Sequence, residues 1–295
     1  MTRLQDWLQL LRVSNAPTCV TNVLVGCAIG IASLGPDHPG PWIDPGAVLI
    51  VLAGVFGFYF GGMALNDVID AKHDMKTGAP RPIALGRIAR GKAALLALVL
   101  LGVGIIGCSL AGGIHGLVAG LVLLTCIVLY DLLHRAAWPA ILLMGCCRGL
   151  VYVIAAFAVT PAPDAGLLIA FGLGLGFHTM LVTSIARKEW SGSRPAAWHS
   201  LLLPLAPCGA LLAVGAVEPW AVILFGVILA LWLGRMNRLL LESPPRVVNA
   251  VLAGLSGIAL LDAFYLAMLG WAVLAFLALA CFALTSLAHR SISGT

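Results

Sequence analysis

Long apolar stretches, separated by short polar segments, follow one another along almost the whole chain. Several approach or exceed 18 residues, the length that indicates a helix able to cross the hydrocarbon core of a bilayer. We therefore expect an all-α, polytopic transmembrane bundle and treat residues 1–295 as one transmembrane domain. The expected spans cover residues 17–34, 47–66, 92–111, 115–130, 138–160, 165–186, 199–216, 219–234, 247–269 and 271–288.

Composition supports the same interpretation and excludes a soluble globular protein. Hydrophobic residues make up 61% of the chain and charged residues only 10%, whereas a soluble domain carries about 25% charged residues. The net charge of +5 does not indicate nucleic-acid binding, because the cations lie in short loops between apolar stretches. The lipid bilayer is the expected partner.

The distribution of the cations predicts the orientation of the spans. With the N-terminus inside, every Lys and Arg of the chain except Arg148 falls in a segment on the inner side, while Asp37, Asp44, Asp164 and Glu218 fall in the outer loops. Cytoplasmic loops of membrane proteins carry an excess of Lys and Arg. We therefore expect the N-terminus, and the loops after spans 2, 4, 6 and 8, to be cytoplasmic.

The strongest candidate site is the segment from Asn66 to Asp74, at the cytoplasmic end of the second span. If the helix continues, Asp67, Asp70 and Asp74 lie at positions i, i+3 and i+7 and point to one side, with Asn66 alongside and Lys72 between them. Carboxylates gathered in this way repel one another unless a cation joins them, and Mg²⁺ binds to one or two carboxylates plus phosphate oxygens. The alternative is a polar helix end at the interface.

Cations around this cluster could hold a phosphate. Arg81 lies between two prolines that stiffen its position and could bind phosphate with two hydrogen bonds, although the other cations of its loop could serve topology alone. Tyr130, His134 and Arg135 close the fourth span and could also hold phosphate oxygens; the alternative is an aromatic anchor next to an inside cation.

Further charges lie in or beside the later spans. Arg148 is expected to line the central cavity and to face a diphosphate or an aspartate, or else to reach the cytoplasmic interface with its long side chain. Arg187, Lys188 and Glu189 end the sixth span, where Glu189 could complete a metal site or pair with its cationic neighbours. For Asp262 in the ninth span a structural hydrogen bond is expected.

The pattern Asn66-Asp67-x-x-Asp70-x-x-x-Asp74, followed by Arg81-Pro82-x-x-x-Gly86-x-Ile88, resembles the first signature of the UbiA superfamily of intramembrane prenyltransferases. Two weaker marks are similar to the family as well: Arg12-x-x-Asn15-x-Pro17, and Tyr130-x-x-x-His134-Arg135 with His where Lys is usual. The resemblance implies a bundle of nine spans around a central cavity. It also implies that Mg²⁺ binds an isoprenyl diphosphate, with Asn66, Asp67, Asp70 and Asp74 as the metal-diphosphate motif and Arg81 and Tyr130 as diphosphate neighbours.

The sequence departs from the family pattern in its second half. Ser184, Lys188 and Glu189 occupy the stretch where the family has a second Asp-rich motif. Arg187 and Lys188 could replace a second metal ion as fixed positive charge for the leaving diphosphate. The variant pattern is similar to a divergent UbiA-like group of Ebo-type bacterial operons.

These features predict Mg²⁺-dependent transfer of an isoprenyl group from a prenyl diphosphate to a lipophilic, in the first place aromatic, acceptor. We expect Asp67, Asp70 and Asp74 to hold the metal, and Arg81, Tyr130, Arg148 and Arg187 to stabilise the leaving group. No obvious general base stands out, so the acceptor is either intrinsically nucleophilic or uses Glu189. Asn66, Lys72, His134, Arg135 and Lys188 are expected to contact the substrate. Two alternatives stay open: a non-catalytic carrier of a prenylated or small precursor, and a cyclase that needs no acceptor. A bacterial inner membrane is the expected location.

Overall fold

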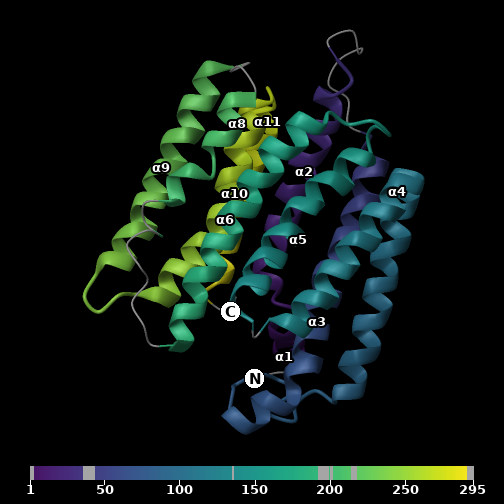
Figure 1. The fold of residues 1–295 in the computed structure, drawn as a ribbon, viewed down its shortest axis with the longest axis vertical. Coiled ribbons are helices and arrows are strands. Elements are labelled where there is room, and N and C mark those ends of the chain that lie inside the picture. The colour runs from purple at the N-terminus through teal and green to yellow at the C-terminus, as the bar shows by residue number, and fades with distance from the viewer. Residues whose placement is uncertain are drawn as a thin grey trace.

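A computed structural model describes residues 3–35, 44–134, 136–191, 199, 202–213 and 218–290. The described residues are helical, as predicted, and no strand occurs among them. Figure 1 shows the helices side by side, most of them running along the long axis of the molecule. The elements in chain order are α1 (Arg3–Leu10), η1 (Val13–Asn15), α2 (Ala16–Ala32), α3 (Pro45–Thr77), α4 (Arg90–Leu133), α5 (Ala137–Phe157), α6 (Ala165–Ser191), η2 (Leu203–Leu205), α8 (Cys208–Ala213), α9 (Pro219–Leu241), α10 (Val247–Met268) and α11 (Ala272–Ala288).

Helix α3 is the longest uninterrupted helix of the described chain, and it carries the aspartate cluster. It begins at Asp44, whose carboxylate accepts hydrogen bonds from the backbone N–H groups of Gly46 and Ala47. It does not stop at the apolar boundary predicted near residue 66 but continues to Thr77, where Gly78 ends it with a positive φ of 71°. Glycine tolerates this left-handed conformation, which is common at helix C-termini. The polar segment is therefore helical throughout.

Helix α4 reverses its direction at Gly113 and forms two antiparallel arms. Gly113 has φ 57° and ψ −139°, a conformation that is essentially restricted to glycine. A Cβ atom on Gly120 would lie 3.3 Å from Cβ of Cys108, although these residues would be about 18 Å apart in a straight helix. The two spans predicted at 92–111 and 115–130 are therefore the two arms of α4 (Figure 1).

Seven of the described helices are long and apolar enough to cross a membrane by length and composition, and α11 is a shorter apolar helix. Because α4 counts as one helix here and consists of two arms, the number agrees with the predicted nine to ten spans. The prediction at 199–216 is described only in part, by η2 and α8, and Asp37, Arg135 and Arg194 lie outside the described residues.

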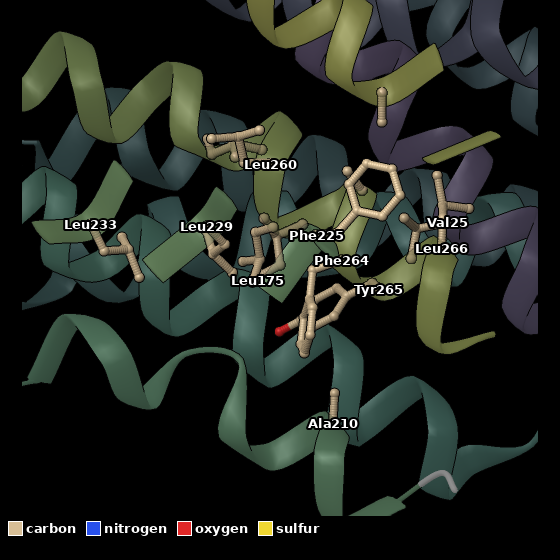
Figure 2. Packing of buried hydrophobic residues seen from close by; sticks show 14 of the residues in the cluster. Val25, Leu175, Ala210, Phe225, Leu229, Leu233, Leu260, Phe264, Tyr265 and Leu266 are labelled. Atoms are coloured by element: carbon tan, nitrogen blue, oxygen red, sulfur yellow. The ribbon is translucent and has the colours of Figure 1, made fainter. Parts of the chain in front are cut away.

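The main apolar core forms around α10, which packs against α2, α6, α9 and α11. Val25, Leu175, Phe225 and Leu266 are buried there, and Figure 2 shows their side chains gathered between the helices. Tyr265 donates a hydrogen bond to the carbonyl oxygen of Ala206 at 3.1 Å. A smaller apolar cluster joins α2, α3, α4 and α5 and surrounds the candidate site.

Candidate active site

The three aspartates at the end of α3 lie on one side of the helix, as their spacing predicts, and their carboxylates converge on the guanidinium group of Arg81. Nη1 of Arg81 lies 3.2 Å from Oδ1 of Asp67, 3.3 Å from Oδ2 of Asp70 and 3.1 Å from Oδ2 of Asp74. All three carboxylates are buried, with 3–5% of each residue exposed. Buried acids need compensating positive charge. The guanidinium of Arg81 supplies part of it, because its Nη1 contacts all three carboxylates.

The chain after α3 folds back and brings Arg81 over these acids. Gly78 ends the helix, and the backbone N–H of Ala79 donates to the carbonyl oxygen of Asp74 at 3.0 Å. The loop is also fastened where it meets α4, because Nε of Arg90 donates to the carbonyl oxygen of Val68 at 3.0 Å. The prolines on either side of Arg81 restrict its backbone. The position of Arg81 is therefore fixed from both ends of the loop.

Two further basic side chains, those of Arg12 and His134, lie next to the three acids. Nη2 of Arg12 lies 3.8 Å from Oδ1 of Asp67. Nε2 of His134 lies 3.0 Å from Oδ1 of Asp70, and its Nδ1 lies 2.8 Å from the carbonyl oxygen of Asp131. Both ring nitrogens of His134 thus face oxygen atoms. Arg12, Arg81 and His134 together surround the three carboxylates.

The donor chemistry of this cluster fits Mg²⁺, which prefers carboxylate oxygens. Among the described residues no group of three or more His, Cys, Asp and Glu side chains has the spacing of a formed metal site, and the guanidinium of Arg81 lies where the carboxylates converge. Asp67, Asp70 and Asp74 are nevertheless the residues that would hold a divalent cation, since they offer three carboxylates to one point.

A cavity of about 110 Å³ lies within the apolar bundle, between α2, α3, α4 and α5. Phe58, Leu123 and Val151 supply apolar walls, and Asp131 belongs to the lining as well. Asp131 accepts a hydrogen bond from Nδ2 of Asn66 at 2.9 Å, and Asn66 precedes Asp67 on α3. An apolar chamber thus begins beside the charged cluster, as a substrate with a charged head and a hydrocarbon tail would require.

Arg148 lines this cavity, as predicted, but its contacts are with residues other than the α3 aspartates. Its Nη1 donates to Oδ1 of Asn22 at 2.9 Å, and its guanidinium lies over the ring of Tyr59, 5.8 Å from the centroid. Nδ2 of Asn22 in turn donates to Oδ2 of Asp262 at 2.7 Å. The hydroxyl groups of Thr21 and Tyr152 also donate to Asp262, which confirms the structural hydrogen bonding expected for this residue.

The other predicted residues are distributed around the cluster. Tyr130 lines the cavity, and Nη1 of Arg187 donates to the carbonyl oxygen of His134 at 2.7 Å. Lys72 is exposed on α3, and Lys188 is half-buried near the end of α6. Arg135 lies outside the described residues, as does the side chain of Glu189, so the predicted roles of these two stay predictions.

Three residues of this region were not singled out from the sequence as site residues. Arg12 contacts Asp67, Asp131 accepts from Asn66, and Asn22 joins Arg148 to Asp262. Arg12 and Asp131 stood inside recognised motifs, and a lone amide in the apolar first span was the available signal for Asn22. Their partners lie 55 to 240 residues away along the chain, a distance over which periodicity carries no information.

The fold and the site define an integral membrane protein with an acidic cluster above an apolar cavity. The profile of the UbiA prenyltransferase family matches residues 23–250, which is most of the chain. The chain therefore belongs to the UbiA prenyltransferase family. No curated protein matches it.

Solved structures agree with this fold. A UbiA homolog from Archaeoglobus fulgidus has a TM-score of 0.62 at 14% identity, covering 92% of this chain and 98% of its own. The same protein bound to GPP and Mg²⁺ has a TM-score of 0.56 at 12% identity, with 92% and 99% covered. A structure of digeranylgeranylglyceryl phosphate synthase has a TM-score of 0.56 at 19% identity, with 96% and 100% covered. At sequence identities this low, the structural similarity shows that the fold is shared and nothing further.

Proposed function

We propose that the protein transfers an isoprenyl group from a prenyl diphosphate to a lipophilic acceptor, in the first place an aromatic one, in a Mg²⁺-dependent reaction. One observation carries the proposal: three buried carboxylates converge on a single cationic atom beside an apolar cavity. Family membership supports it, as does the A. fulgidus homolog that was solved with GPP and Mg²⁺. Mg²⁺, when bound, would supply charge that stabilises a leaving diphosphate.

The residues divide between the two ends of the substrate. Asp67, Asp70 and Asp74 would hold the cation, and Arg81, at the point where they converge, would contact the diphosphate oxygens. The other predicted contacts to the diphosphate head are Asn66, Lys72, Tyr130, His134, Arg135, Arg148, Arg187 and Lys188. The apolar walls at Phe58 and Val151 receive the hydrocarbon tail.

The reaction breaks the bond between the allylic carbon and the diphosphate oxygen, and diphosphate leaves with the electron pair. A nucleophilic atom of the acceptor attacks the allylic carbon, forms the new bond and then loses a proton, for which Glu189 is the proposed base. A cavity with apolar walls keeps water from the allylic cation, so that transfer is favoured over hydrolysis. The cation-rich end, with the reaction site, is proposed to face the cytoplasm of a bacterial inner membrane.

The test uses the full chain in lipid nanodiscs with labelled geranyl diphosphate and a panel of aromatic acceptors. Release of diphosphate should require Mg²⁺, stop with EDTA, and fall by about 10²–10³-fold in Asp70→Asn. Asp164→Asn is the matched control, because this exposed carboxylate caps α6 away from the cluster and Asn caps a helix equally well. Binding of geranyl diphosphate without turnover on every acceptor, or turnover in EDTA, would overturn the proposal.

A further inference from the structure

The carboxylate of Asp131 is the feature of the cavity that the proposed prenyl transfer leaves unexplained. Asp131 lies in the last turn of α4 and lines the cavity, with only 2% of the residue exposed. Its Oδ1 accepts a hydrogen bond from Nδ2 of Asn66, whereas its Oδ2 is buried and has no hydrogen-bond partner among the described residues. Because a buried polar atom without a partner is costly, this oxygen is a candidate for contact with a ligand.

The basic side chains nearby contact other acids. Arg12 and Arg81 contact the aspartates at the end of α3. His134 directs Nε2 to the carboxylate of Asp70, and its Nδ1 lies near the backbone carbonyl oxygen of Asp131 rather than its side chain. None of the ion pairs formed within the described part of the chain includes Asp131. Its carboxylate is therefore not compensated by direct contact with a cationic side chain.

Arg148 is the other charged residue of the cavity lining, and it has a different counter-charge. Its Nη1 donates to Oδ1 of Asn22 at 2.9 Å, and Nδ2 of Asn22 donates to Oδ2 of Asp262 at 2.7 Å. Asp262 is fully buried and therefore compensates the guanidinium through one intervening amide. Of the two charged residues that line the cavity, Asp131 is the one whose charge is left for a ligand to balance.

Aromatic rings make the same cavity favourable for a cation. Phe58, Tyr59 and Tyr130 belong to its lining, and the face of an aromatic ring attracts a cation that lies within about 6 Å of its centre. The ring of Tyr59 already has a guanidinium 5.8 Å from its centroid. A carboxylate oxygen beside aromatic faces and apolar walls is the combination that binds an ammonium group attached to a hydrocarbon body.

We propose that the carboxylate of Asp131 binds a protonated amine of the acceptor, so that the acceptor is a lipophilic amine. This inference rests on the proposed prenyl transfer and deepens it, because it specifies the class of the acceptor. The ammonium group donates a charge-assisted hydrogen bond to Oδ2, and the body of the acceptor lies against the apolar walls. Asn66 is a positioning residue, because its amide holds Oδ1 of Asp131. Since Asn66 directly precedes Asp67, the acceptor is held beside the proposed diphosphate site.

The test compares a cationic probe with an uncharged probe of similar shape. The full chain in nanodiscs of zwitterionic lipid is titrated by calorimetry with 4-butylbenzylamine, which is protonated at neutral pH, and with 4-butylbenzyl alcohol. Empty nanodiscs give the partitioning of each probe into lipid. We expect the wild type to bind the amine at least about tenfold more tightly than the alcohol.

Matched variants assign the preference to Asp131. Asp131→Asn should bring the ratio of the two Kd values to about one, because the amide keeps an oxygen for Asn66 but removes the charge. Asp131→Glu keeps the charge and should recover part of the preference. Asp164→Asn is the control, because it makes the same chemical change at an exposed carboxylate on α6, and it should leave the ratio unchanged.

The aspartates at the end of α3 are the other carboxylates that could attract an amine. The titrations are therefore repeated with geranyl S-thiolodiphosphate and Mg²⁺, which occupy those aspartates under the proposed function. The preference for the amine should persist or increase. The same donor analogue reports on folding, because Asp131→Asn should bind it at least as tightly as the wild type does.

The outcomes distinguish this inference from the proposed function. A wild type that binds the thiolodiphosphate but shows no preference for the amine overturns the amine site alone. A preference that persists in Asp131→Asn, or that disappears when the thiolodiphosphate and Mg²⁺ are bound, overturns it as well. A loss of thiolodiphosphate binding in Asp131→Asn assigns Asp131 to the donor and has the same consequence. Failure of the wild type to bind the thiolodiphosphate overturns the proposed function, whatever the amine does.

Discussion

The carboxylates at the end of α3 and the carboxylate of Asp262 are all buried, yet their partners differ. Asp67, Asp70 and Asp74 face cationic side chains, above all Arg81. Asp262 faces two hydroxyl groups and one amide. Neutral donors from two neighbouring helices hold the carboxylate of Asp262 inside the bundle, whereas the guanidinium beside the α3 acids is a cation for which another cation can substitute. The difference suggests that Asp262 serves the fold and the α3 acids serve a ligand.

The largest expected effect tests the structural half of this comparison. Asp262→Ala leaves the buried donors of Asn22 and Tyr152 without their acceptor and leaves Arg148 without its compensating charge, whereas Thr21 can still donate to the carbonyl oxygen of Thr18. We expect the free energy of unfolding to fall by about 3–5 kcal/mol, the usual cost of removing one partner of a buried charged network. Tryptophan fluorescence during denaturant unfolding in detergent micelles measures it. A loss below about 1 kcal/mol would show that the network does not support the fold.

The second prediction concerns an α3 acid. Asp74→Asn should lower the rate of prenyl transfer by about 10²–10³-fold and change the free energy of unfolding by no more than about 1 kcal/mol, because it removes one of three carboxylates that repel one another. Nanodisc assays and micelle unfolding on the same preparation give both numbers. Large destabilisation with intact turnover would reverse the comparison.

The third prediction concerns the cation between the α3 acids. Arg81→Met leaves three buried carboxylates with less positive charge, so the melting temperature without divalent cations should fall. Mg²⁺ at 100 times its Kd for the variant should then stabilise the variant by about 2.7 kcal/mol, and it should stabilise the wild type by less at the same concentration. Thermal unfolding with EDTA and with Mg²⁺ measures this, and Arg238→Met, at an exposed position of α9, is the control. Equal responses to Mg²⁺ would contradict exchange between the two cations.

The smallest effect is expected for an ion pair outside both regions. Nη1 of Arg87 lies 3.2 Å from Oδ1 of Asp6, and the arginine side chain is 42% exposed. Asp6 is buried, with 5% of the residue exposed, but water reaches the pair from the arginine side, so Arg87→Met should lower the free energy of unfolding by about 1 kcal/mol and change turnover by less than about twofold. A larger effect on turnover would extend the functional region to α1.

The sequence predicted the parts of the molecule that depend on local spacing. The i, i+3, i+7 pattern was sufficient to place Asp67, Asp70 and Asp74 on one side of a helix, and the apolar pattern was sufficient to separate the two arms of α4. Both follow from helical geometry within one segment. The prolines around Arg81 marked it as fixed, although they did not show that it meets all three acids.

Pairings between distant segments could not be predicted in the same way. Asn22 and Asp262 lie 240 residues apart, and each alone is only a polar residue in an apolar span. Their contact depends on how α2, α5 and α10 pack, which is set by many small apolar contacts. For the same reason the sequence placed Arg148 in the cavity but could not name Asn22 as its partner.

The reversal at Gly113 has a consequence for how the chain enters the membrane. Between Lys92 and Asp131 the sequence contains no Asp, Glu, Lys or Arg, so neither arm of α4 carries a charged flank at the bend. Because no charged residue separates the two arms, we expect them to enter the lipid together, as one helical hairpin, during biosynthesis. A charge introduced at the bend would therefore interfere with insertion itself, before any question of catalysis arises.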